Sequence, residues 1–164
     1  MLELGCAIGE TSRYLAPLSL RLIAVDGSST AINEATKRLR YEKHVHFRLA
    51  NLPGEMPRGP FELIVVSEIA YYLRVHQLVT LGQRIIKALA PGGRVVALHH
   101  RRQFDDAAQL PALAHLRLRT QLAQSLSIVA SSRYPQFDVV TLEKGRKPAI
   151  DQELGTMTRA GSGC

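Results

Sequence analysis

The sequence predicts an α/β protein with an open, mostly parallel sheet of seven strands and helices on both faces. Short apolar runs alternate with segments of helical periodicity, which is typical of parallel strands joined by crossover helices. The first run ends in a glycine-rich loop, and the last two runs are separated only by a short turn. The loop indicates a ligand site at the carboxyl edge of the sheet, and the turn indicates an antiparallel hairpin.

The amino-terminal half supplies three strands and two helices. The run 21–26 is continuous and apolar, as expected of a strand covered on both faces. Pro17 ends the first helix, and Ala31, Ile32, Ala35 and Leu39 have the spacing of one buried helix face. We expect strands over 1–4, 21–26 and 45–49, with the first one shortened, and helices over 11–15 and 29–40.

The carboxyl-terminal half supplies four strands and two helices. Pro91-Gly92-Gly93 is expected to end a long amphipathic helix before the fifth strand, and 132–135 to form the turn of the hairpin. The segment 145–164 is rich in Gly, Ser and Thr, so we expect one domain over 1–144 and a disordered tail. The expected strands are 61–66, 94–98, 127–131 and 136–142, and the expected helices are 75–89 and 111–124.

Composition narrows the class of protein. The chain has 164 residues, of which 46% are hydrophobic, enough for one domain with a core. No apolar run is long enough to cross a membrane, no signal peptide opens the chain, and Cys6 and Cys164 make no disulfide framework. We therefore expect a cytoplasmic protein without a membrane partner. The net charge of +7 comes from scattered residues, which favours ordinary solubility over a nucleic-acid partner.

The charge of the glycine loop indicates its ligand. The loop reads Glu3-Leu4-Gly5-Cys6-Ala7-Ile8-Gly9-Glu10. A dinucleotide site needs glycines at G-x-G-x-x-G, and Glu10 stands where the third should be. Two like charges a few ångströms apart cost about 1 kcal/mol in water and several at a lower effective dielectric. Glu3 and Glu10 therefore disfavour a pyrophosphate and favour S-adenosylmethionine, which carries a sulfonium and an ammonium.

Four segments in order resemble the Rossmann-like, class I S-adenosylmethionine-dependent methyltransferases. They are the loop 3–9, Val25-Asp26, the segment 61–73 and Pro91-Gly92-Gly93. The Gly-Cys-Ala loop and the segment from Ser67-Glu68 to Tyr71-Tyr72-Leu73 are similar to the nodulation protein S-like N-methyltransferases. That resemblance covers 1–144 and implies S-adenosylmethionine as cofactor. It implies a small-molecule acceptor, the free amine of an amino sugar or deacetylated chitooligosaccharide.

The resemblance also implies roles for the cofactor-binding residues. Asp26 would accept both ribose hydroxyls, because a carboxylate suits two neighbouring donors. Glu3 would reach the ammonium group, and Asn51 would accept from the adenine amine. The alternative roles are helix capping for Asp26, a surface charge at the end of a strand for Glu3, and turn formation for Asn51. The expected cofactor-binding residues are Glu3, Gly5, Cys6, Ala7, Gly9, Asp26, Gly27, Asn51, Leu52 and Ser67.

The expected catalytic residues end the fourth and fifth strands. An attacking amine must be neutral, so a proton acceptor is needed. Glu68 is the first candidate, His99 is a second base, and Tyr71 would wall the acceptor pocket. The alternatives are a helix-start carboxylate for Glu68 and a core position for the tyrosine. The acidic and histidine residues lack metal-ligand spacing, so we expect no metal.

Two other functions remain open at this point. The family resemblance implies helices before the first strand, and the loop stands at the start of this sequence, so we expect an N-terminally truncated methyltransferase. Such a domain could bind cofactor weakly and lack activity. A nucleic-acid methyltransferase is disfavoured, because the fourth strand ends in Ser67-Glu68-Ile69-Ala70 and not in a Pro-Pro-aromatic motif.

Overall fold

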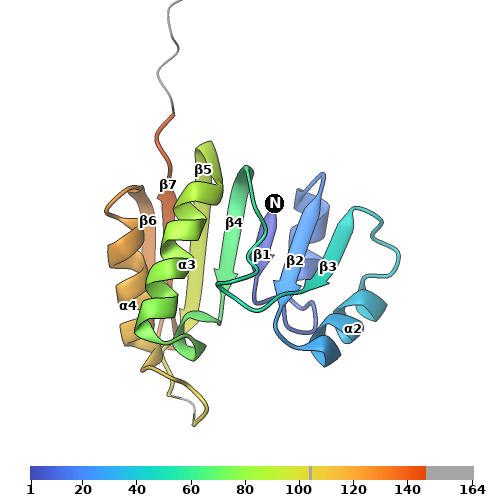
Figure 1. Ribbon diagram of the computed structural model, residues 1–164, viewed down its shortest axis with the longest axis horizontal. Helices are drawn as coiled ribbons and strands as arrows, with labels where there is room; N and C mark the ends of the chain where they lie inside the picture. The colour runs from blue at the N-terminus through green and yellow to red at the C-terminus, as the bar shows by residue number, and fades with distance from the viewer. Residues whose placement is uncertain (104, 147–164) are drawn as a thin grey trace, which may run out of the picture.

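The computed structural model describes residues 1–103 and 105–146. Their seven strands form a sheet in the order β3-β2-β1-β4-β5-β7-β6 (Figure 1). All neighbouring strands are parallel except β7, which runs antiparallel to β5 and β6. The predicted fold class is therefore confirmed. The strands are β1 (Leu2–Leu4), β2 (Leu22–Asp26), β3 (Val45–Leu49), β4 (Phe61–Ser67), β5 (Leu89–His100), β6 (Ser127–Arg133) and β7 (Phe137–Glu143).

Helices cover both faces of the sheet because the strand side chains alternate. In β2, Leu22 and Ala24 pack with Leu15 and Ile32 from the first two helices, and Val25 belongs to the larger core on the opposite face. That larger core is completed by the last two helices, which pack against each other (Figure 1). The helices are α1 (Ser12–Leu15), α2 (Ser29–Arg38), α3 (Val75–Ala88) and α4 (Pro111–Leu122), with 3-10 turns η1 (Ala16–Leu18) and η2 (Ala70–Tyr72).

The centre of the sheet holds the larger core together. Leu2 and Leu4 of β1 are fully buried and stand opposite Ile64 and Val66 of β4. Each such side chain stabilises the fold by roughly 1.5–3 kcal/mol relative to an exposed one. Among the described residues, no helix is long and apolar enough to cross a lipid bilayer. The expected tail lies outside the described residues from position 147 onward.

The fifth strand begins earlier than predicted. Helix α3 ends at Ala88 as expected, but Pro91, Gly92 and Gly93 lie inside β5 and not before it. The reason is pairing with the end of the hairpin. Gly92 N donates to Lys144 O at 2.9 Å, and Lys144 N donates to Gly93 O at 2.9 Å. The segment Pro91-Gly92-Gly93 therefore continues the hydrogen-bonded ladder between β5 and β7.

Glu3 lies inside the sheet as a fully buried carboxyl group in the middle of β1. Ser12 Oγ of α1 donates to its Oε2 at 2.6 Å. Its Oε1 has no hydrogen-bond partner among the described residues. Burial raises the pKa of Glu3 from 4.5 to about 7, and the Ser12 hydroxyl opposes only part of that shift.

We expect Glu3 to make the stability of the fold depend on pH. Its folded-state pKa lies above the ordinary value of 4.5, so the native state holds the proton more tightly than the unfolded chain. Stability from this group is therefore full below pH 4.5 and declines as the pH rises through about 7, by about 3 kcal/mol. Glu3→Gln should flatten this decline, as measured by urea unfolding at both ends of the window.

Glu62→Gln is the matched control, because Glu62 is an exposed glutamate at the start of the neighbouring strand β4. This variant should keep the wild-type pH dependence. An equally steep decline in Glu3→Gln would show that another group causes it.

Candidate functional site

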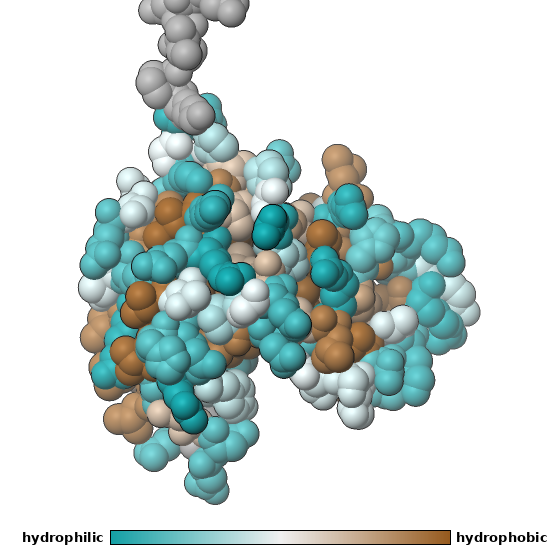
Figure 2. Space-filling model, in the orientation of Figure 1, coloured by the Kyte–Doolittle hydropathy of each residue, from teal (hydrophilic) through white to brown (hydrophobic). Residues whose placement is uncertain are grey.

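A cavity of about 440 Å³ lies at the carboxyl edge of the sheet. Its walls come from the residues that directly follow β1, β2, β3 and β4. In the surface view, the lower edge is indented between the part that carries α3 and the part that carries α2 (Figure 2). The volume is in the range of small-molecule sites. The lining residues are Gly5, Ala7, Asp26, Gly27, Ala50, Asn51, Leu52, Glu68, Ile69, Tyr71, Tyr72 and Leu73.

Gly5 forms the floor of the cavity because no other residue fits there. Its φ is +81°, and an added Cβ would lie 1.9 Å from Ile69 Cγ2 and 2.7 Å from the carbonyl oxygen of Ser67. The amides of Gly5 and Cys6 both donate to Val25 O, at 2.9 and 3.0 Å. The loop after β1 is therefore fixed to the end of β2 and pressed against the end of β4.

Asp26 lies at the junction of two loops and lines the cavity. Its Oδ2 accepts from Ala7 N at 2.9 Å, and its Oδ1 accepts from Ser28 N at 2.8 Å. A carboxylate offers about four acceptor positions. The side chain can therefore hold both loops and still accept hydrogen bonds from two neighbouring hydroxyls of a ligand.

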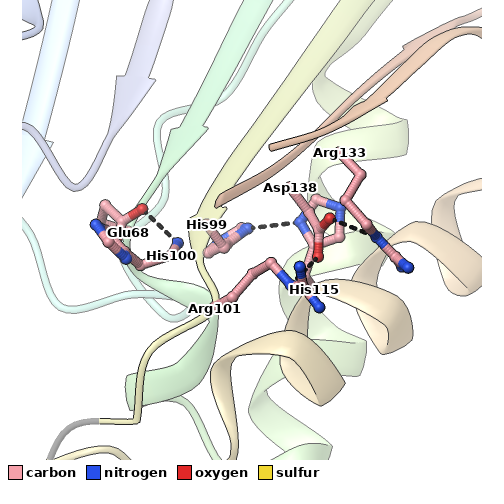
Figure 3. Close-up of polar contacts among 7 residues, drawn as sticks. All are labelled: Glu68, His99, His100, Arg101, His115, Arg133 and Asp138. Carbon is pink, nitrogen blue, oxygen red and sulfur yellow. Dashed lines mark hydrogen bonds and ion pairs between the residues drawn. The ribbon is translucent and has the colours of Figure 1, made fainter. Parts of the chain in front are cut away.

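Glu68 and Tyr71 form the opposite wall. Glu68 has a φ of +57°, a strained conformation for a residue with a side chain. Its Oε2 accepts from the Tyr71 hydroxyl at 2.7 Å. Its Oε1 accepts from His100 N at 2.7 Å, the contact drawn in Figure 3. Burial and the Glu68 carboxylate raise the pKa of Tyr71, so its hydroxyl stays protonated and remains a donor.

Cys6 and Gly9 are in the expected loop but do not line the cavity. The Cys6 side chain is 2% exposed and packs in the smaller core, where burial raises its thiol pKa. Gly9 has a φ of +82°, and an added Cβ would lie 3.2 Å from atoms of Ala35 and Leu39. Gly9 therefore allows the loop to approach α2, which is a packing role that the glycine pattern did not separate from ligand contact.

His99 lies outside the cavity, and its position does not fit a base that touches substrate. It is fully buried, and burial lowers its pKa to about 3. Its Nε2 accepts from Ala70 N at 3.2 Å, and its Nδ1 lies 3.1 Å from Nδ1 of His115 (Figure 3). His99 is therefore a positioning residue that holds η2, the turn that carries Tyr71.

Two further residues that were expected to bind the cofactor do not line the cavity. Glu3 and Ser67 are buried behind the lining residues, so neither side chain faces the cavity in this structure. Ala50, Ile69 and Leu73 line it but were not predicted. Ile69 and Leu73 are apolar members of the segment 61–73, to which the sequence assigned no contact role, whereas Ala50 directly follows a strand and could have been found on that ground. The described residues contain no group of three or more His, Cys, Asp or Glu that could hold a metal ion.

Comparison with known proteins agrees with this geometry. A family profile described as a methyltransferase domain matches residues 1–93. Nodulation protein S of Sinorhizobium fredii (strain NBRC 101917 / NGR234) is 34% identical over 96 residues, which are 58% of this chain and 44% of that protein. Nodulation protein S of Rhizobium tropici is 32% identical over 96 residues, 58% of this chain and 40% of that protein. The matched part is therefore less than half the length of these curated relatives.

A solved structure extends the likeness beyond the matched segment. N-methyltransferase NodS from Bradyrhizobium japonicum WM9, in complex with S-adenosyl-L-homocysteine, superposes with a TM-score of 0.74 at 26% identity. The superposition covers 87% of this chain and 76% of that one. The profile match spans more than half of the sequence and contains the loop, Asp26 and Glu68. The chain therefore belongs to the methyltransferase domain family and has the Rossmann-like fold of the class I S-adenosylmethionine-dependent enzymes.

Proposed function

We propose that this chain carries the catalytic domain of an S-adenosylmethionine-dependent methyltransferase that methylates a small molecule. The proposed acceptor is an amine nitrogen of an amino sugar or chitooligosaccharide. One observation carries the proposal: the charged residues lining the cavity, Asp26 and Glu68, are both acidic. The site is therefore suited to a cationic cofactor and a basic acceptor, and is unsuited to a phosphate-bearing ligand.

The wall near β1 and β2 fits S-adenosylmethionine. Asp26 keeps acceptor positions for the two ribose hydroxyls, and Asn51 and Leu52 lie beside it for the adenine ring. The orphaned Oε1 of Glu3, buried in β1 behind the Gly5 loop, is a further acceptor for the ammonium group, reached through water. When bound, this cofactor supplies a methyl group activated on a cationic sulfur.

The opposite wall fits an amine on a sugar ring. Tyr71 and Tyr72 have ring centroids 4.6 Å apart, and Tyr72 is 47% exposed, so a sugar face can pack on it. Glu68 is fixed by Tyr71 and His100 and keeps free acceptor positions for an amine proton. Removing that proton gives the neutral nitrogen that can attack. Correct positioning of the two reactants can contribute about 7–11 kcal/mol to catalysis.

The relatives support the same reaction class. The solved structure from Bradyrhizobium japonicum is an N-methyltransferase with S-adenosyl-L-homocysteine bound. The residues that would hold the cofactor lie within the segment matched to the methyltransferase domain.

We expect Asp26→Asn to weaken binding of S-adenosyl-L-homocysteine by about 10- to 100-fold. The reason is that the variant loses charge-assisted hydrogen bonds to the ribose, each worth about 1.5–3 kcal/mol. Titration calorimetry measures the change, and thermal unfolding checks that the loops held by Asp26 remain folded. Glu62→Gln is the control, since it removes an exposed carboxylate far from the site. Equal affinities for wild type and Asp26→Asn would place the ribose elsewhere.

We expect Glu68→Gln to slow methyl transfer by about 100-fold or more, the usual contribution of a general base. Cofactor affinity should change little, because Asp26 is on the other wall. The assay follows transfer of a labelled methyl group to a panel of amino sugars and deacetylated chitooligosaccharides. A chain that binds S-adenosyl-L-homocysteine but methylates no amine in the panel would support a cofactor-binding domain without this activity.

A further inference from the structure

A second cavity, of about 430 Å³, lies between α4 and the β6–β7 hairpin. It is separated from the first cavity by the buried pair His99 and His115. Tyr71, which lines the first cavity, has its ring centroid 6.2 Å from that of His99. His115 lines the second cavity. The polar part of the lining consists of Arg101, His115, Arg119, Ser131, Ser132, Arg133 and Asp138.

The second cavity has an excess of positive charge. It is lined by three arginines and one aspartate, which leaves a formal charge of +2. Asp138 lies between two of the arginines, 3.1 Å from Arg133 Nε and 3.7 Å from Arg101 Nε (Figure 3). Arg119 has no ion pair among the described residues. A second anionic group placed here would face three guanidinium groups, which favour carboxylate and phosphate oxygens.

Hydrogen bonding directs one more donor at this cavity. Burial lowers the pKa of both His99 and His115, so both rings are neutral at pH 7. Ala70 N can only donate, so Nε2 of His99 is unprotonated and its Nδ1 carries the proton. Nδ1 of His99 therefore donates a hydrogen bond to Nδ1 of His115, which accepts it without a proton of its own. The second nitrogen of His115 must therefore be an N–H.

This N–H belongs to a side chain that is 6% exposed and lines the second cavity. Among the described residues none accepts a hydrogen bond from it. The nitrogen itself is open to the cavity, since it is not one of the fully buried polar atoms that lack a partner, and an acceptor group placed there can take its hydrogen bond. The charges that face His115 are those of Arg119, Arg133 and Asp138.

The rest of the lining is apolar. Leu110, which directly precedes α4, and Leu113 and Leu116 of α4 are 54%, 38% and 52% exposed and line the cavity together with the arginines. These leucines offer an apolar surface on which a hydrocarbon chain can pack, and the arginines lie at the end of that surface.

We propose that this second cavity binds an organic anion, with an apolar body on the α4 leucines and a carboxylate or phosphate held by Arg119, Arg133 and His115. Such a ligand differs from the cationic cofactor and the basic acceptor proposed above, so the inference does not depend on the proposed function. Through His99 and Ala70, the occupied cavity would also support η2 and Tyr71.

The test is a titration of the full chain with three probes that share one hydrocarbon body. Octanoate and octyl phosphate carry the two possible anionic groups, and octanamide carries no charge. We expect at least one anion to bind, octanamide to bind at least tenfold more weakly, and the His115 ring proton signals to shift on binding. Calorimetry gives the affinities, and the stronger of the two anions identifies the preferred group.

Arg119→Gln should weaken anion binding by about tenfold, because it removes a charged hydrogen-bond donor without unpairing Asp138. Arg117→Gln makes the same change on the same helix but outside the cavity, and should bind like wild type. Thermal unfolding shows that both variants are folded. The proposal is overturned if neither anion binds at millimolar concentration, if octanamide binds equally well, or if Arg119→Gln has the affinity of Arg117→Gln.

Discussion

The loop after β1 passes so close to the end of β4 that a side chain at position 5 would overlap Ile69 and the Ser67 carbonyl. This contact fixes the distance between the two walls of the cofactor cavity. Asp26 is held on one side by the same loop, through Ala7 N, and Glu68 follows Ser67 on the other. A residue larger than glycine would displace β4 and with it the Glu68 carboxylate. The close packing of the backbone at Gly5 therefore sets the position of Asp26 relative to Glu68.

The end of β5 supports both cavities at once. Successive residues of a strand point to opposite faces. His99 is buried toward α4 and joins His115, and the backbone N–H of His100 holds Glu68. Glu68 is kept in a left-handed conformation that ordinarily costs about 1–3 kcal/mol, and these contacts offset part of that cost. The cavity wall formed by Glu68 and Tyr71 is therefore held by hydrogen bonds from a strand that does not itself line the cavity.

Residue patterns predicted most of this architecture because the strands are apolar runs bounded by turn residues. The order of elements, the hairpin and the placement of Asp26 and Glu68 at strand ends all followed from local sequence. The burial of His99 did not, because it depends on α4, which is far along the chain. The packing of Gly9 was not predicted for a similar reason: its neighbours Ala35 and Leu39 come from α2. The early start of β5 depends on Lys144, another distant partner.

Strand β6 forms the outer edge of the sheet, and every one of its residues is exposed. Such an edge offers backbone groups to which a strand of another molecule could add. Its pairing with β7 is interrupted by a register shift between Ile128 and Ala130. A bulge of this kind twists the edge away from straight pairing. The irregularity therefore disfavours edge-to-edge pairing beside the exposed side chains of Ile128 and Val129.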